Sequence, residues 1–167
     1  MLTLSSLLVQ RGVASMRAVE EAIARQVLHG GDLATAVLEI DAVPEVVLTP
    51  LFAESLGLLP AAGRLRPASP EALHALPSEL AALHRIFPLE LRPSAREGSP
   101  DTLVIATSEP LPPPVEEDLG FALAVALELR AAPLARIWQA QGEHYGLPVE
   151  RRIARVTARL DGRTEPS

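Results

Sequence analysis

Residues 4–26 read LSSLLVQRGVASMRAVEEAIARQ, and their pattern of apolar side chains recurs, in degraded form, 29 positions later in LATAVLEIDAVPEVVLTPLFAES, residues 33–55. The matched positions of the first copy are Leu4, Leu7, Leu8, Val9, Gly12, Val13, Val19, Ala22, Ile23 and Gln26. Those of the second copy are Leu33, Ala36, Val37, Leu38, Asp41, Ala42, Leu48, Leu51, Phe52 and Ser55. A repeated apolar spacing with a break after its first segment predicts two helix-turn-helix units that stack and bury their faces against each other.

Four helices are expected in the N-terminal part of the chain, residues 1–58. They cover residues 3–11, 16–28, 32–40 and 44–57. Ser15 can cap the second helix, and Pro50 is expected to kink or split the fourth. The apolar residues of the second helix fall on one stripe, which we expect to face the core. These residues are Val19, Ala22, Ile23 and Val27.

A linker and a small sheet are expected next. Residues 59–69 form the linker, because proline and glycine favour a loop there. Residues 70–146 then predict an α+β unit, a sheet with helices against it. Its three expected strands cover residues 86–91, 102–107 and 126–130. Pro88 cannot donate to a strand neighbour, so the first strand is expected at an edge and the second in the centre.

Three helices are expected in the same unit. They cover residues 77–84, a segment that begins near Glu116, and residues 134–144. Ser78 is the expected cap of the first of these helices. The three prolines at 112–114 are expected to be extended before the second.

The C-terminal segment, residues 147–167, predicts a basic amphipathic helix and a tail. Its apolar stripe consists of Val149, Ile153, Val156 and Leu160. Its basic stripe consists of Arg151, Arg155 and Arg159, with Arg152 beside it. Three interpretations remain open. The arginines form a solvated face, or they bind an acidic partner, because arginine forks fit carboxylates bidentately. The third is contact with an anionic membrane surface, which a few charges without an aromatic anchor would hold weakly.

The composition excludes several classes of function. The 167 residues carry a net charge of −6 and contain no cysteine and no lysine, so all fifteen basic residues are arginines. The acidic balance disfavours nucleic acid as a partner, and neither the four scattered histidines nor any nucleophile motif predicts a metal site, a cofactor or an enzyme. No secretory signal and no apolar run of the ~20 residues that span a membrane occurs. We therefore expect a cytoplasmic protein without direct membrane insertion.

Four further motifs follow the repeat in order: LPSEL at residues 76–80, HRIFPL at 84–89, LVIA at 103–106 with Pro110 after it, and HYG at 144–146. Together with residues 4–26 they resemble the N-terminal domain of the type II secretion and type IV pilus assembly ATPases, including its cyclic-di-GMP-binding MshEN branch. The resemblance covers about residues 1–146. It implies a domain that attaches the ATPase to the cytoplasmic part of an inner-membrane platform protein.

The resemblance also implies a dinucleotide groove, with an arginine and a glycine at the head of each repeat. This chain has Thr3 and Ser5 there in the first copy, and Asp32 and Ala34 in the second. Loss of two charged hydrogen bonds removes about 3–6 kcal/mol of binding energy, although Arg11 or Arg25 could contact the ligand from another angle. The degenerate groove would consist of Thr3, Leu4, Ser5, Leu8, Gly12, Gln26, Asp32, Leu33 and Ala34.

The ATPase motor of this family is missing, because the phosphate-binding motif Gly-x-x-x-x-Gly-Lys-Ser/Thr does not occur. We therefore expect a non-catalytic module that docks to a protein component, a platform protein or an ATPase, of a type II secretion, type IV pilus or motility machine. That partner would recruit it to the inner-membrane face. It would bind the exposed groove between the two helical repeats and, on the C-terminal helix, Arg151, Arg152, Arg155 and Arg159. Two alternatives remain: a cyclic-di-GMP receptor, and a structural N-terminal domain of a longer protein.

Overall fold

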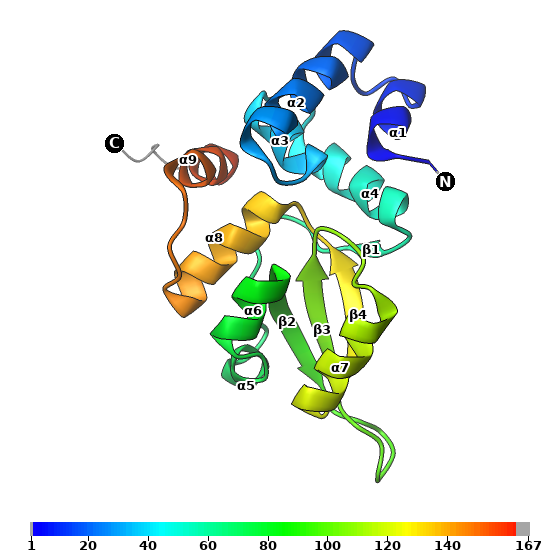
Figure 1. Ribbon diagram of the computed structural model, residues 1–167, viewed down its shortest axis with the longest axis vertical. Helices are drawn as coiled ribbons and strands as arrows, with labels where there is room; N and C mark the ends of the chain where they lie inside the picture. Colours follow the sequence, from blue (N-terminus) through cyan, green and yellow to red (C-terminus); the bar gives the residue numbers. More distant parts are fainter. Residues whose placement is uncertain (1, 163–167) are drawn as a thin grey trace.

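The computed structural model describes residues 2–162, and residues 163–167 of the predicted tail lie outside this range. The described part forms nine helices and four strands. A group of helices lies above a sheet that is covered by further helices (Figure 1). The α+β class predicted from the sequence is confirmed.

The repeat in the sequence is a repeat in the backbone. The four N-terminal helices are α1 (Leu4–Gln10), α2 (Met16–His29), α3 (Leu33–Glu39) and α4 (Glu45–Leu56). After α1, Gly12 adopts a φ of 69°, and after α3 the matching Asp41 adopts a φ of 54°. The predicted break after each first segment is therefore the same left-handed turn in both copies.

The helix α2 is only partly covered. Ser15 caps it as predicted, because its side chain accepts a hydrogen bond from the Ala18 N–H at 3.1 Å. Val19 and Ala22 are buried, but Ile23 is 40% exposed and Val27 is 82% exposed. The prediction that the whole stripe faces the core is thus wrong for its second half, because the apolar stripe is wider than the surface that packs against it.

The helix α4 runs unbroken through Pro50, so of the predicted kink or split the split is wrong. Proline leaves the carbonyl four residues earlier, that of Val46, without its helical partner. Both Pro50 and Val46 are exposed, so water can hydrate this carbonyl and the helix can continue.

The sheet has four strands where three were predicted. They are β1 (Leu59–Pro60), β2 (Ile86–Arg92), β3 (Thr102–Thr107) and β4 (Ala126–Ala131), in the order β1-β4-β3-β2. The pair β2 and β3 is antiparallel, whereas β4 is parallel to both β3 and β1. The strand with Pro88 is at an edge and β3 is central, as predicted. The additional strand, β1, lies in the segment expected to be a linker.

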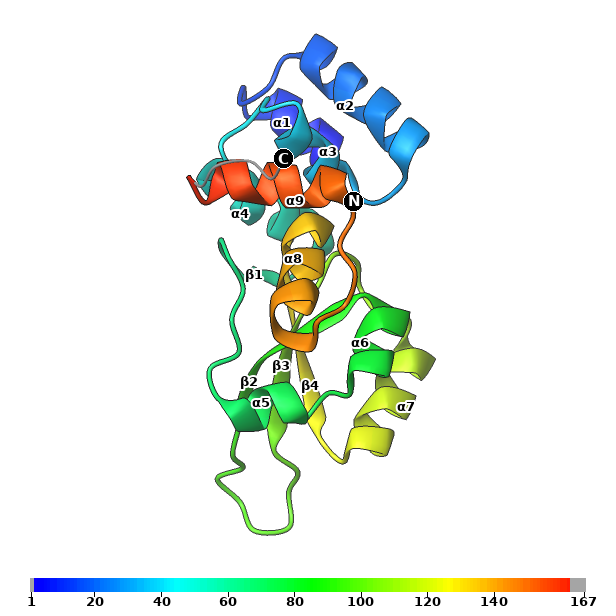
Figure 2. The same cartoon turned by 90° about the vertical axis from the view of Figure 1, so that its left-hand side faces the viewer.

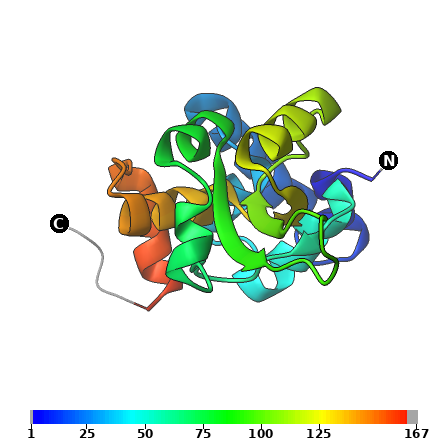
Figure 3. The ribbon, with the colours of Figure 1, turned by 90° about the horizontal axis from the view of Figure 1, so that it is seen from below.

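Helices cover both faces of the sheet. Leu103 and Ile105 of β3 pack with α6 (Ser78–His84) and α7 (Pro113–Leu123), whereas Ala106 packs with α8 (Leu134–Tyr145) on the other face. Figure 3 shows this arrangement from below, with α8 to the left and α7 at the upper right. A short helix that was not predicted, α5 (Pro70–His74), precedes α6.

Two helix starts differ from the prediction. Ser78 is the first residue of α6 and its side chain makes no cap, because Pro77 occupies the cap position. Pro113 and Pro114 are not extended but form the first two residues of α7, where the fixed φ of proline suits a helix and its missing N–H costs nothing.

The C-terminal helix α9 (Arg151–Leu160) returns to the N-terminal helices (Figure 2). Its Ile153 and Val156 are buried in the same apolar cluster as α1 to α4. Its predicted apolar stripe is therefore the side that docks. None of the helices between residues 2 and 162 has the length and apolar character that crossing a membrane requires.

Candidate functional site

The head of the first repeat is exposed and self-contained. The Thr3 hydroxyl accepts a hydrogen bond from the Ser6 N–H at 3.2 Å and thereby caps α1, and it lies 3.0 Å from the hydroxyl of Ser5. Leu4 and Leu8, two other predicted groove residues, are buried in the core. Thr3 and Ser5 thus offer hydroxyl groups at a helix start and no positive charge.

The head of the second repeat is used inside the protein. The Asp32 carboxylate accepts a hydrogen bond from the Leu134 N–H of α8 at 3.1 Å. Burial raises the pKa of Asp32 above its ordinary value, although the Thr35 side chain and the hydrogen bond from Leu134 act in the opposite direction. Ala34 is fully buried. This repeat therefore directs its polar group toward α8 and not toward a ligand.

Three of the predicted groove residues lie together, in a pocket of about 240 Å³: Gln26, Asp32 and Leu33. The remaining lining consists of Gly31, Arg85, Ser108, Glu109 and Leu134. Thr3 and Ser5 are not part of this lining. Arg85, which lies in the left-handed turn before β2, was not among the predicted groove residues, because no local pattern connects a turn residue to a helix so much earlier in the chain.

The arginines proposed as substitute ligand contacts form ion pairs. Arg11 contacts Glu54 at 2.6 Å, and Arg25 contacts Glu39 at 2.8 Å. The ion pair of Arg25 fixes its side chain toward the end of α3.

The four arginines of α9 are of two kinds. Arg152 contacts the buried Glu39 at 2.7 Å, and Arg159 donates a hydrogen bond to the carbonyl of Leu38. These two arginines hold α9 on the end of α3. Arg151 and Arg155 are exposed, and neither has an ion-pair partner within residues 2–162. Of the four arginines predicted to contact a partner, Arg151 and Arg155 are therefore the two whose guanidinium groups are not already used within the described residues.

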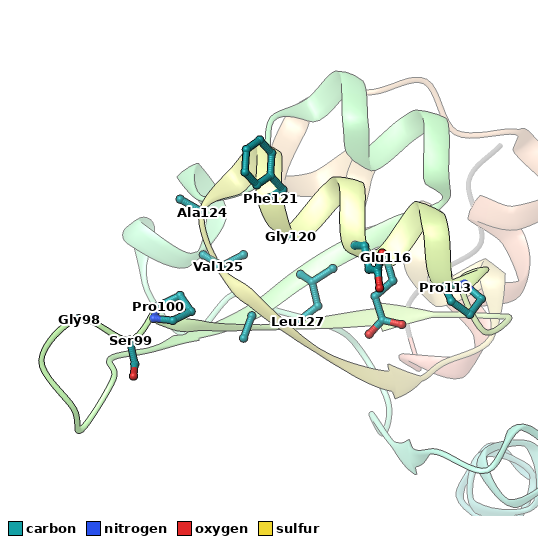
Figure 4. A pocket seen from close by; sticks show the side chains of 12 residues that line it. Gly98, Ser99, Pro100, Pro113, Glu116, Gly120, Phe121, Ala124, Val125 and Leu127 are labelled. Carbon is teal, nitrogen blue, oxygen red and sulfur yellow. The ribbon is translucent and has the colours of Figure 1, made fainter.

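A further groove, the α7 groove, has a volume of about 980 Å³. It lies between α7, the start of β4 and the loop before β3 (Figure 4). Phe121 stands at its margin with 90% of its surface exposed. Much of its lining is apolar, including Pro100, Val125 and Leu127, and two acids, Glu116 and Glu117, lie on the α7 side. This groove could not be predicted from the sequence, because the three segments that form it meet only in the fold.

A family model and two solved structures match this chain. The model of the MshEN domain family matches residues 56–151. The solved structure of MshE with cdg is 25% identical, covers 87% of this chain and 100% of that chain, and has a TM-score of 0.57. The N-terminal domain of XpsE is 19% identical, covers 83% of this chain and 90% of that chain, and has a TM-score of 0.40. A comparison with curated proteins finds no match.

Four packed helices followed by a covered four-stranded sheet define a module of the class found at the N-terminus of secretion and pilus ATPases. The chain belongs to the MshEN domain family. The resemblance seen in the sequence is thereby confirmed. The family match begins at Leu56, so the helical repeat lies outside it.

Proposed function

We propose that this chain is a non-catalytic protein-interaction module that docks to a component of a type II secretion, type IV pilus or motility machine. Its membership of the MshEN family supports a module of this kind. The observation that carries the docking is Phe121, which is 90% exposed beside the α7 groove. An aromatic side chain left in water next to an apolar groove is typical of a surface that a protein partner completes.

The α7 groove fits an extended segment with apolar and basic side chains. The strand β4 pairs with β1 only through Arg130 and Ala131, so residues 126–129 have no strand neighbour on that side within the described part of the chain. An extended peptide can add to such an edge through main-chain hydrogen bonds. Glu116 and Glu117 would face basic side chains of that segment. The partner would hold the module in the cytoplasm, at the inner-membrane face.

Cyclic-di-GMP is the second candidate partner, because MshE was solved with cdg. Asp32 argues against it. This carboxylate stands where the resemblance places an arginine, and it is already hydrogen-bonded to Leu134. Neither repeat head supplies a positive charge, so the two charged contacts that the resemblance implies for a phosphodiester are missing there. We therefore propose a protein partner and not the dinucleotide.

Cross-linked affinity capture from lysate tests the docking surface. We expect the tagged chain to recover a component of a secretion, pilus or motility machine, and Phe121→Ser to reduce that recovery by about tenfold, since an aromatic side chain that a partner buries contributes more than about 1.4 kcal/mol to many interfaces. The matched control is Val27→Ser, which removes another exposed apolar side chain, from α2. Equal recovery with Phe121→Ser, or recovery of unrelated proteins alone, would contradict the proposal.

A further inference from the structure

Five arginines meet in a groove of about 380 Å³ between α9, α2 and the end of α3. Arg25 comes from α2, and the other four come from α9: Arg151, Arg152, Arg155 and Arg159. Glu39 and Val156 complete the lining. Because arginine stays protonated at any physiological pH, the lining carries five positive charges and one negative charge, and a second acid, Glu150, pairs with Arg152 from outside the lining at 3.6 Å. A chain with a net charge of −6 thus gathers five of its fifteen arginines at one small groove.

Three of the five arginines are fixed without any ligand. The Glu39 side chain is 3% exposed, and its two oxygens bind arginines from different helices. Oε2 accepts a hydrogen bond from Nε of Arg25 at 2.8 Å, and Oε1 accepts one from Nη1 of Arg152 at 2.7 Å. Arg159 donates to the Leu38 carbonyl at the end of α3. Binding of a ligand here therefore costs little side-chain entropy at these three arginines, because they are already ordered.

The other two arginines are placed at a cost to the helix. Arg151, Arg155 and Arg159 follow one another at intervals of four along α9, a spacing at which like charges repel and destabilise a helix. Neither Arg151 nor Arg155 forms an ion pair with a carboxylate of residues 2–162, whereas Arg152 pairs with Glu39 and Glu150. An anion held between Arg151 and Arg155 would offset this repulsion.

The surroundings of the groove define the chemistry of the anion. Val156 is the one apolar residue of the lining and is itself buried, so the groove lacks the apolar anchor points on which a protein segment depends. The apolar side of α9 is packed against the core through Ile153 and Val156, so it cannot insert into a bilayer. A compact anion with several charges fits best.

We infer that this groove binds a compact oligophosphate, two or more linked phosphate groups that are free or part of a nucleotide. Arginine forks match phosphate oxygens bidentately, and the volume lies within the range of about 300–1,000 Å³ that is common for small-molecule sites. Arg25 and Arg152, held on Glu39, form the fixed wall, and Arg151 and Arg155 close on the ligand from α9. The site is separate from the α7 groove, so its outcome is independent of the proposed docking function.

Isothermal titration calorimetry of the full chain with sodium tripolyphosphate, at low ionic strength, tests this site. We expect saturable binding that weakens as salt is added. In Arg151→Gln/Arg155→Gln, affinity should fall by about 10- to 100-fold, since each charge-assisted hydrogen bond contributes strongly. The matched control is Arg17→Gln/Arg66→Gln, which removes the same charge from two exposed arginines outside the groove and should change affinity little.

Two further titrants identify the ligand. ATP that binds as tightly as tripolyphosphate assigns recognition to the phosphate chain alone, and tighter binding of ATP assigns it to a nucleotide; both support the site. Tighter binding of a hexaglutamate peptide than of tripolyphosphate would overturn the inference and assign the groove to an acidic protein segment. Absence of saturable binding, or binding that the Arg151→Gln/Arg155→Gln variant leaves unchanged, would also overturn it.

Discussion

Asp32 is a buried carboxylate that serves a helix other than the one it precedes. It stands directly before α3 but makes no cap there, and its Oδ2 atom accepts the hydrogen bond from Leu134 of α8. Its Oδ1 atom has no hydrogen-bond partner within the described residues. Burial therefore dominates, and it raises the pKa of Asp32 above its ordinary value of 3.8. At a pH between the ordinary and the raised pKa value, the folded chain keeps a proton on Asp32 that the unfolded chain has already released.

This pKa shift predicts how stability depends on pH. Because the folded state binds more protons, the contribution of Asp32 to stability is full below pH 3.8 and is lost as the pH rises through its raised value. Each unit of difference between the two pKa values amounts to about 1.4 kcal/mol. We expect Asp32→Asn, which keeps an oxygen for the Leu134 N–H, to abolish this loss.

Urea denaturation at several pH values, from about pH 4 to about pH 7, measures the effect. The control is Asp41→Asn, which removes an exposed carboxylate from the same group of helices and should keep the pH dependence of the native chain. The same pH dependence in Asp32→Asn as in the native chain would show that the Asp32 carboxylate is not the group responsible.

The start of α8 is capped by another element. Pro133 precedes this helix and has no side-chain group that could accept a hydrogen bond. The first two N–H groups of α8 instead donate to side chains from the start of the second repeat. The Leu134 N–H donates to the carboxylate of Asp32, which precedes α3, and the Ala135 N–H donates to the hydroxyl of Thr35 in α3 at 3.0 Å. These bonds join residues about 100 positions apart and fix the N-terminal helices on the sheet.

Two buried threonines allow a matched test of this capping. Thr35→Val leaves the buried Ala135 N–H without an acceptor, so we expect a loss of about 1–3 kcal/mol in the free energy of unfolding. Thr49 is equally buried, but its hydroxyl has no hydrogen-bond partner among residues 2–162. Thr49→Val should therefore be neutral or stabilising. Chemical denaturation of both variants decides: losses of similar size would mean that the Thr35 hydroxyl does not act as a cap.

Local patterns in the sequence were sufficient to predict most elements. The repeat predicted α1 to α4 because each turn and cap, such as Gly12 and Ser15, depends on residues within a few positions. The strands β2 and β3 were predicted for the same reason, since their apolar runs are bounded by proline, glycine and serine. Asp41 was matched to Gly12 by spacing alone, and it adopts the same left-handed backbone.

Features that depend on distant residues could not be predicted. The strand β1 has two residues and exists because β4 lies beside it. The exposure of Val27 depends on how far α3 covers α2, which no periodicity reports. Half of the lining of the five-arginine groove, the part on α9, could be predicted, because the C-terminal helix was predicted to be basic. The other half, Arg25 and Glu39, is brought to α9 by the fold alone.

At the scale of the molecule, Arg136 joins three separate parts of the chain. It lies on α8 with its side chain 3% exposed, and it contacts both carboxylate oxygens of Glu45 on α4 at 2.7 Å. It also contacts Asp161, just after α9, at 2.8 Å. Burial alone would lower the pKa of Arg136, but the hydrogen bonds to the two acids outweigh it and the net shift is upward.

Removal of Arg136 is therefore expected to weaken the whole molecule. Arg136→Met leaves Glu45 and Asp161 without their guanidinium, and breaking a buried ion pair from one side costs about 3–5 kcal/mol. The control is Arg64→Met, which breaks the half-exposed pair of Arg64 with Glu143 and should cost about 0–1 kcal/mol. Trp138, the one tryptophan of the chain, packs against both the helical core and the sheet core. Its fluorescence in urea should therefore shift together with the far-ultraviolet circular dichroism. If Arg136→Met lowers the free energy of unfolding no more than Arg64→Met does, Arg136 does not join the three parts of the chain.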